Sequence, residues 1–126
     1  MVKLKSQMVF DLEYFFEVVP DLLCIAGFDG YFKKINPAVC KVLGYSEMEL
    51  FAAPIKDFIH PENRERTAEK CTALLKGRLL LNFENRYLMK EGAIVWLSCT
   101  SVPIKKDRLV FAFAKDITLS QAARGV

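Results

Sequence analysis

The sequence has little of the chemistry from which catalytic and metal sites are built. His60 is its only histidine, and the four cysteines, Cys24, Cys40, Cys71 and Cys99, lie far apart with no Cys-x-x-Cys pair. This spacing gives no zinc or redox motif, and no Ser/His/Asp set or phosphate-binding glycine loop is visible. We therefore expect buried thiols, no metal site and no enzyme activity in this chain.

Net charge and long apolar runs are also small. The formal net charge is +3 at pH 7 and the basic residues are scattered, so the sequence gives no argument for nucleic-acid binding. No apolar run approaches the ~20 residues of a membrane span. The first residues, MVKLKSQMVF, lack the long apolar stretch and the cleavage site of a signal peptide. We expect a cytoplasmic protein that makes no direct contact with a membrane.

Apolar residues, in contrast, make up 52% of the 126 residues, with ten Phe against one Trp. These values favour one globular domain with a core of flat aromatic rings. A first helix is predicted from apolar residues at helical spacing: Leu12, Phe15, Phe16 and Val19. Asp29-Gly30 between two apolar runs predicts a β-hairpin with both turn residues at positive φ. Asn36 is placed to cap a second helix, which ends at Gly44.

Two further helices are predicted before the sequence pattern changes. Ser46 and Glu49 form a capping box, and a long helix follows from Pro61 to Gly77. Its predicted apolar stripe is Ala68, Cys71, Leu74 and Leu75. After Gly77 the hydrophobic period becomes two, which predicts three long strands over residues 79–89, 93–104 and 108–117, joined by short antiparallel connections.

In this order and at these spacings, the sequence resembles a PAS domain over about residues 10 to 118. The matching segments are FFEVVPDLLCIAGFDGYFKKINPAVCKVLGYSEMEL, IHPENRERT and NRYLMKEGAIVWLSCTSVPIKKDRLVFAFAKDIT. The resemblance implies an α+β fold: a five-stranded antiparallel sheet, with helices packed on one face and a flanking N-terminal helix. We expect the flanking helix in residues 1–20, the PAS core in 21–118 and the start of a linker in 119–126. We also expect the hairpin strands to sit between the later strands.

The family's pattern implies roles for the two faces of the sheet. The residues expected to face the helices and to line a ligand pocket are Cys24, Ala26, Phe58, Cys71, Leu75, Phe83, Asn85, Tyr87, Leu97, Cys99, Ser101, Ala112 and Ala114. The residues expected on a dimer or partner surface are Leu12, Phe15, Phe16, Trp96, Phe111 and Phe113. Asp116 and Thr118 lie where the last strand of PAS domains passes to the output linker, and short polar side chains can bond the local backbone there. They are the candidate signal relay.

The ligand is not identified by the sequence. The photosensing flavin branch of the family carries a reactive Cys in a G-x-N-C-R-type motif, whereas the corresponding stretch here, LFAAPIKDFI, has none. Haem needs an axial ligand, and His60 instead matches a His-Pro-Asp/Glu pattern common in PAS domains without haem. A non-covalent small molecule remains. Ala112 and Ala114 leave room for one, with polar groups from Asn85, Tyr87 and Ser101. The alternative is a pocket filled by side chains such as Phe58 and Phe83.

PAS domains are sensory and interaction modules of signalling proteins, often joined to histidine kinases or cyclases, and they usually dimerise. We therefore expect a sensing module of a larger, bacterial-type signalling protein, such as a two-component system. It would form a homodimer and relay a ligand- or partner-induced change to a kinase or cyclase output domain. The alternative is a ligand-free protein–protein interaction or dimerisation module.

Overall fold

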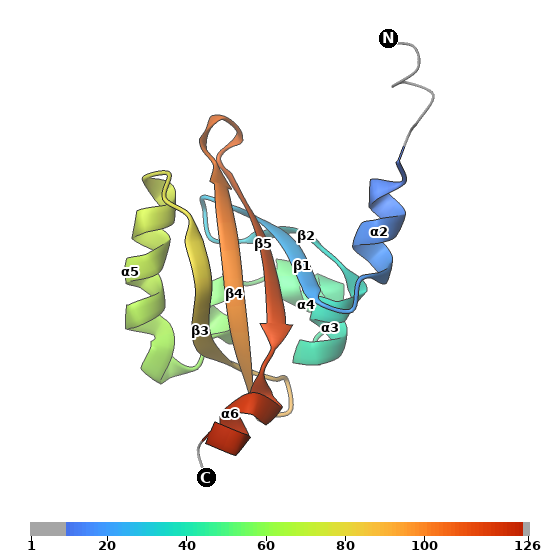
Figure 1. Ribbon diagram of the computed structural model, residues 1–126, viewed down its shortest axis with the longest axis vertical. Coiled ribbons are helices and arrows are strands. Elements are labelled where there is room, and N and C mark those ends of the chain that lie inside the picture. The colour runs from blue at the N-terminus through green and yellow to red at the C-terminus, as the bar shows by residue number, and fades with distance from the viewer. Residues whose placement is uncertain (1–9, 125–126) are drawn as a thin grey trace.

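The computed structural model describes residues 10–124, which form one antiparallel sheet with helices around it (Figure 1). The strands are β1 (Leu22–Gly27), β2 (Phe32–Ile35), β3 (Leu80–Leu88), β4 (Ile94–Ile104) and β5 (Leu109–Asp116). Their order in the five-stranded sheet is β2-β1-β5-β4-β3. The predicted α+β fold with its five-stranded antiparallel sheet is confirmed. The predicted position of the hairpin strands is wrong, because β5 pairs with β1 on one side and with β4 on the other, which leaves the hairpin at an edge.

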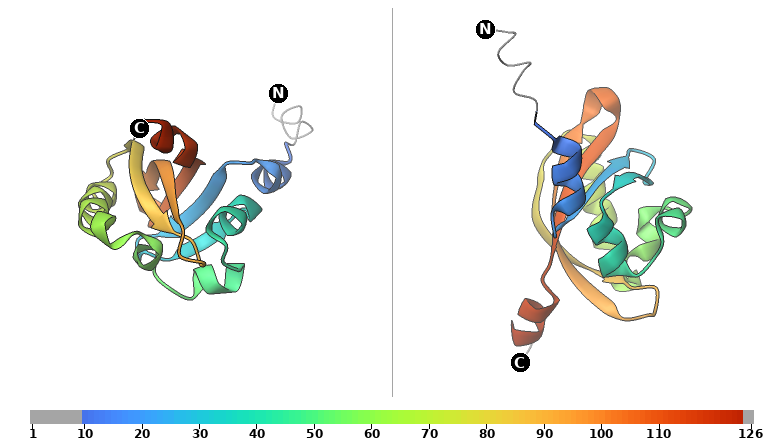
Figure 2. Two further views of the ribbon diagram at one scale, coloured as in Figure 1. Left: turned by 90° about the horizontal axis from the view of Figure 1, so that it is seen from below. Right: turned by 90° about the vertical axis from the view of Figure 1, so that its right-hand side faces the viewer.

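The helices lie on both sides of this sheet. They are α2 (Leu12–Val18), α3 (Pro37–Leu43), α4 (Glu47–Phe51), α5 (Arg64–Leu75) and α6 (Thr118–Arg124), with 3-10 turns at Ile55–Phe58, Pro61–Asn63 and Lys105–Asp107. Helices α3, α4 and α5 pack on one face, called the inner face below; α6 lies on the side of the opposite, outer face, and α2 flanks the β2 edge (Figure 2). Parts of the predicted flanking helix and linker, residues 1–9 and 125–126, lie outside the described residues. Within residues 10–124 no helix has the length and apolar character of a membrane span.

The core lies between the inner face and helices α3 and α4. Leu43 and Leu50 are 1% and 0% exposed, and they pack with strand residues such as Val95 and Leu97. The predicted capping box starts α4: the Ser46 hydroxyl accepts a hydrogen bond from the Glu49 amide at 3.1 Å, and the Glu49 carboxylate accepts one from the Ser46 amide at 2.8 Å. Gly44 ends α3 with φ of 82°, a conformation that glycine adopts without strain.

The connection between β1 and β2 differs from the predicted tight turn. β1 ends at Gly27 and β2 begins at Phe32, so residues 28–31 form the loop. Gly30 has φ of 86°, but Asp29 does not have positive φ. The Asp29 carboxylate instead accepts a hydrogen bond from the Tyr31 amide at 3.1 Å. The side chain therefore stabilises a wider loop from within.

The predicted apolar stripe of the long helix is also wrong. Residues 61–63 form a 3-10 turn, and the α-helix begins only at Arg64. Of the predicted stripe, Leu74 is buried, whereas Ala68, Cys71 and Leu75 are exposed. The reason is that α5 packs along the edge strand β3 and meets a polar residue there: the Asn85 side chain donates to the Thr67 hydroxyl at 3.0 Å.

Asn36 does not cap α3 through its side chain; it ties the start of β1 to the β2–α3 junction. Its side chain is 1% exposed, and Oδ1 accepts a hydrogen bond from the Leu23 amide at 3.0 Å. Nδ2 donates to the carbonyl oxygens of Val19 and Asp21 at 3.2 and 2.9 Å. Removal of this amide leaves buried backbone groups without partners.

We predict that Asn36→Ala lowers the free energy of unfolding by about 2–4 kcal/mol, because the net loss of the hydrogen bonds adds to the cost of desolvated partners. Urea denaturation monitored by circular dichroism measures the change. The control is Glu69→Ala on the exposed side of α5, with an expected change within about 0.5 kcal/mol. A change as small as the control's in Asn36→Ala would contradict the structural role of this side chain.

Candidate functional site

A small cavity lies between the inner face of the sheet and α3. Its volume is about 40 Å³, and the predicted pocket residues that line it are Cys24, Tyr87, Leu97, Cys99, Ala112 and Ala114. The strand register explains the space: on β5, Ala112 pairs with Cys24 of β1 and Ala114 pairs with Cys99 of β4. Small side chains thus lie at the centre of the sheet, where larger ones would fill the core. The volume is close to the ~30 Å³ that one water occupies in the liquid, so a molecule the size of haem or flavin requires the surrounding elements to move.

The other predicted pocket residues do not line this cavity. Phe58 is buried against the Tyr45 ring, with a centroid distance of 4.9 Å. Phe83 is buried under the guanidinium of Arg66 and the ammonium of Lys70, at 4.9 and 5.9 Å from the ring centroid. Outside the cavity lie also Ala26, which is half-buried, Ser101, which is buried, and Cys71 and Leu75, which are exposed on α5.

Asn85 combines deep burial with an atom that has no partner. It is 2% exposed, and its Nδ2 donates to Thr67, but its buried Oδ1 accepts no hydrogen bond within residues 10–124. The neighbouring Tyr87 lines the cavity, and burial, together with the nearby thiols, raises its pKa well above the ordinary value of 10.0. The amide oxygen of Asn85 is therefore an acceptor available to a donor group in this region.

The thiols that line the cavity, Cys24 and Cys99, have raised pKa values and are therefore weak nucleophiles. Burial, and to a smaller extent the nearby Cys99, raises the pKa of Cys24 from 9.0 to about 12. Burial also raises the pKa of Cys99, although the hydroxyl of Ser101, at 3.8 Å from its sulfur, lowers it in part. Because the thiolate is the nucleophile and the metal ligand, neutral thiols favour non-covalent over covalent contacts with a bound molecule.

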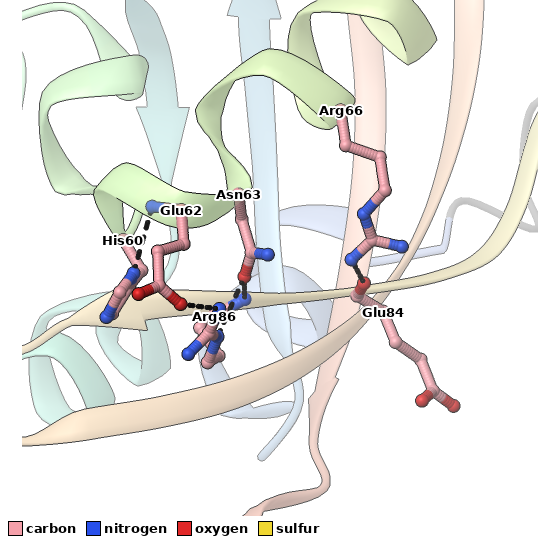
Figure 3. A network of polar contacts seen from close by, with 6 residues as sticks. All are labelled: His60, Glu62, Asn63, Arg66, Glu84 and Arg86. Atoms are coloured by element: carbon pink, nitrogen blue, oxygen red, sulfur yellow. Dashed lines mark hydrogen bonds and ion pairs between the residues drawn. The ribbon is translucent and has the colours of Figure 1, made fainter.

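A polar network covers the free edge of β3 (Figure 3). The backbone amide of Arg86 and its Nε both donate to Oδ1 of Asn63, at 2.8 and 3.1 Å, and its Nη2 pairs with the carboxylate of Glu62 at 3.0 Å. The backbone amide of His60 donates to the Arg86 carbonyl at 2.9 Å. Arg66 Nη2 donates to the Glu84 carbonyl at 2.8 Å. Residues 60–66 thus satisfy backbone groups that an edge strand otherwise leaves exposed.

This network was not predicted from the sequence. His60 precedes the 3-10 turn at Pro61–Asn63, and its Nδ1 accepts a hydrogen bond from the Glu62 amide at 3.1 Å. The His-Pro-Glu motif is visible in the sequence, but the pairing of Asn63 with Arg86 joins residues 23 positions apart. No local pattern indicates such a pair.

Asp116 and Thr118 connect the last strand to α6. Asp116 Oδ1 accepts hydrogen bonds from the Thr118 amide at 3.0 Å and from its hydroxyl at 2.6 Å. The same hydroxyl accepts a hydrogen bond from the Trp96 amide at 3.0 Å, and the Ile117 amide donates to the Trp96 carbonyl at 2.9 Å. Within residues 10–124 no Lys or Arg pairs with Asp116. The two residues thus fasten the start of α6 to β4.

The outer face of the sheet carries exposed aromatic rings. Phe111 and Phe113 of β5 are 45% and 43% exposed, and the Trp96 side chain on β4 is half-buried under the Arg86 guanidinium, 5.4 Å from the ring centroid. α2 does not cover these rings, because it lies beyond the β2 edge (Figure 2).

Helix α2 contacts the sheet mainly through Lys34 of β2. The Lys34 ammonium pairs with Glu13 at 3.0 Å and lies 5.1 Å from the ring centroid of Phe16. Leu12 and Phe15 are 72% and 60% exposed. The predicted partner-surface residues therefore fall into two groups, one on α2 and one on the outer face, and both leave apolar area in solvent.

Comparison with known proteins identifies the family. A family model described as the PAS fold matches residues 32–111. The chain belongs to the PAS family. A stretch of 75 residues of this PAS domain is 28% identical to the probable diguanylate cyclase DgcE of Escherichia coli (strain K12), which covers 59% of the chain but only 7% of that protein.

Solved structures show the same fold. A domain of the sensory box sensor histidine kinase/response regulator from Geobacter sulfurreducens superposes with a TM-score of 0.74 at 19% identity, over 92% of this chain and 97% of that one. The N-terminal domain of a diguanylate cyclase with PAS/PAC sensor from Marinobacter aquaeolei gives a TM-score of 0.70 at 20% identity, over 80% and 98%. At these identities the likeness concerns the fold of the PAS domain.

We predict that Cys24 resists alkylation by iodoacetamide at pH 8 while Cys71, exposed on α5, reacts. The raised pKa keeps the half-buried Cys24 thiol in its unreactive neutral form, whereas the unfolded chain exposes it at its ordinary pKa of 9.0. Peptide mapping by mass spectrometry measures both rates, with the chain in urea as control. Equal labelling of both thiols in the folded chain would contradict the raised pKa of Cys24.

The same difference in pKa predicts that the folded state becomes less stable relative to the unfolded chain as the pH rises above 9.0, because the Cys24 thiol ionises first in the unfolded chain.

Proposed function

We propose that this PAS domain is a sensory module of a larger signalling protein and that it relays a ligand- or partner-induced change to an output domain. The family membership and the fold support a sensory role. The relatives support an output domain of the kinase or cyclase class, since one is named a probable diguanylate cyclase and another a sensor histidine kinase/response regulator. We further propose a cytoplasmic location and a homodimer.

The observation that carries the relay is the hydrogen-bonded passage from β5 to α6. Asp116 ends the central strand, and its carboxylate holds the amide and hydroxyl of Thr118, the first residue of α6. Thr118 in turn holds the Trp96 amide of β4. A shift of β5 against β4 therefore changes the geometry at the start of α6, and a ligand that prefers one of two sheet positions would move α6.

The cavity supports a ligand that binds without a covalent bond. Its walls include neutral thiols and apolar side chains, and Ala112 and Ala114 leave the space. Asn85 adds a buried acceptor nearby. We propose a small neutral molecule with a hydrogen-bond donor, whose binding requires the walls to move apart because the cavity volume is only about 40 Å³.

We predict that Asp116→Ala, in the longer protein that joins this chain to its output domain, weakens the signal-dependent change in output by about fivefold. The loss of hydrogen bonds worth about 1 kcal/mol at the junction gives this factor. Stability falls by less than about 1 kcal/mol because Asp116 is exposed. The measurement is kinase or cyclase activity with and without the signal.

The matched control for this experiment is Asp107→Ala in the β4–β5 connection, another exposed aspartate. It should leave the signal response unchanged. Unchanged regulation in Asp116→Ala, with a folded protein, would rule out the relay through this residue.

The outer face favours a second function, that of a dimerisation or docking module without a ligand. Exposed Phe111 and Phe113 lie on the central strand, and α2 presents Leu12 and Phe15 to solvent. Such apolar area commonly marks an interface. In this function the cavity is a packing gap and the α2 and outer-face surfaces carry the interaction.

We predict that the parent chain is a dimer and that Phe113→Glu shifts it to the monomer, because a charge at the centre of an apolar interface weakens association by more than about tenfold. Native mass spectrometry reports the oligomeric state and any bound small molecule in one measurement. The control is Met48→Glu, a change at an exposed apolar residue on α4. A Phe113→Glu chain that assembles like the parent would exclude the outer-face dimer, whereas a dimer with no bound mass would favour the ligand-free function.

A further inference from the structure

Glu84 of β3 is bonded to two helices on opposite sides of the sheet. Its backbone carbonyl accepts the hydrogen bond from Arg66 of α5 at 2.8 Å. Its carboxylate Oε1 accepts a hydrogen bond from Nε2 of Gln121 of α6 at 2.6 Å and pairs with Nη2 of Arg124 at 3.5 Å. In Figure 3 the Glu84 side chain points away from the residues of α5. One residue of an edge strand thus contacts both α5 and α6.

Helix α5 is fastened to the sheet by few apolar contacts. Leu74 is its buried residue. Its polar contacts with β3 are the hydrogen bond that Arg66 donates to the Glu84 carbonyl, the hydrogen bond that Asn85 donates to the Thr67 hydroxyl, and the cations of Arg66 and Lys70 over the Phe83 ring. Elements with little buried apolar area open at low free energy, so α5 is the wall of the inner face that moves most easily.

Helix α6 depends on its contacts with the sheet even more strongly. It has seven residues and none of them is buried. A helix this short does not persist alone in water, because nucleation costs more than its few hydrogen bonds return. Its contacts with the sheet are Thr118 at its first residue and the Glu84 pairings of Gln121 and Arg124 in its later turns.

A second chain of contacts runs parallel to the first. Asn63, next to the start of α5, holds the backbone amide and Nε of Arg86. The Arg86 guanidinium lies over the Trp96 ring, and the Trp96 amide is bonded to Thr118. Both chains start at the N-terminal end of α5, cross β3 and end on α6.

We propose that Glu84 couples α5 to α6, so that displacement of α5 from the sheet releases the later turns of α6. Arg66 fixes the backbone of the edge strand at Glu84, and the backbone position sets where the carboxylate meets Gln121 and Arg124. This inference rests on the proposed relay and deepens it: the coupling to α6 then runs through Glu84 as well as through Asp116 and Thr118. Because binding equilibria are reciprocal, loss of the α6 contacts also loosens α5.

The test is a double-mutant cycle in the 126-residue chain, read by NMR without ligand or output domain. The variants are Arg66→Ala, Glu84→Ala and both together, and the readout is the helix population of residues 120–123 from ¹³C secondary shifts. Glu84→Ala should lower the helix equilibrium constant about two- to fivefold, the size expected for an exposed ion pair with one added hydrogen bond. Arg66→Ala should lower it less, and the double variant should match Glu84→Ala alone.

Lys70→Ala is the matched control for Arg66→Ala, since it removes the other cation over Phe83 without touching Glu84. It should change α6 less than Arg66→Ala does, because it leaves the hydrogen bond to the Glu84 backbone in place. A second readout is independent of these variants: Gln121→Ala with Arg124→Ala should speed amide exchange in residues 67–71 about twofold or more, a scale set by the loss of a surface pairing. An unchanged α6 in Arg66→Ala, additive effects in the cycle, or unchanged exchange in α5 would each overturn the coupling.

These outcomes are separate from those of the relay experiment. The cycle needs no signal, so it can fail while Asp116→Ala still weakens regulation, and coupling through Glu84 can hold in a chain whose output does not depend on Asp116. The double-mutant cycle therefore tests the coupling of α5 to α6 through Glu84, and the Asp116→Ala experiment tests whether the domain relays a signal to its output domain.

Discussion

The fold depends on the insertion of β5, the last strand in the sequence, between β1 and β4. β5 is antiparallel to both neighbours, with Leu22–Gly27 paired to Ala114–Leu109 on one side and Leu97–Ile104 paired to Asp116–Leu109 on the other. Without it the β1–β2 hairpin and the β3–β4 hairpin have no hydrogen bonds to join them into one sheet. The chain therefore leaves the sheet from a central strand and not from an edge. Any movement of one hairpin relative to the other reaches Asp116, the last residue of β5, directly.

The same strand explains why the two faces differ. Ala112 and Ala114 turn small side chains to the inner face, where they leave the cavity, and Phe111 and Phe113 turn large rings to the outer face, where they remain exposed. An arrangement with the large side chains inside would fill the cavity and remove these exposed rings from the outer face. The alternation in one strand thus provides both the inner cavity of a sensing module and the exposed apolar face of a docking module.

Local patterns in the sequence predicted the parts of the fold that local physics determines. The capping box at Ser46, the end of α3 at Gly44 and the alternation in β5 follow from spacing within a few residues. The errors arose where a residue's partner is distant in sequence. The sequence predicts Asn36 as the cap of the adjacent helix, yet its side chain is hydrogen-bonded to the backbone of Val19, Asp21 and Leu23. The predicted stripe on α5 assumes an apolar neighbour, yet α5 contacts the polar Asn85. The position of the hairpin failed for the same reason, because strand order is a long-range property.

Apolar burial in this domain is uneven, and the low burial of α5 and α6 favours transmission along β3. Leu43 of α3 and Leu50 of α4 are fully buried in the apolar core, whereas α5 buries Leu74 alone and α6 buries no residue. The edge strand β3 has one strand neighbour, and polar contacts from residues 60–66 cover its free side. Exposed polar contacts contribute little each, about 1 kcal/mol or less, so small changes in binding energy suffice to break them, while the apolar centre stays intact. The weakly held helices are therefore the parts of the molecule that can respond to a signal, and Glu84 of β3 has polar contacts with both of them.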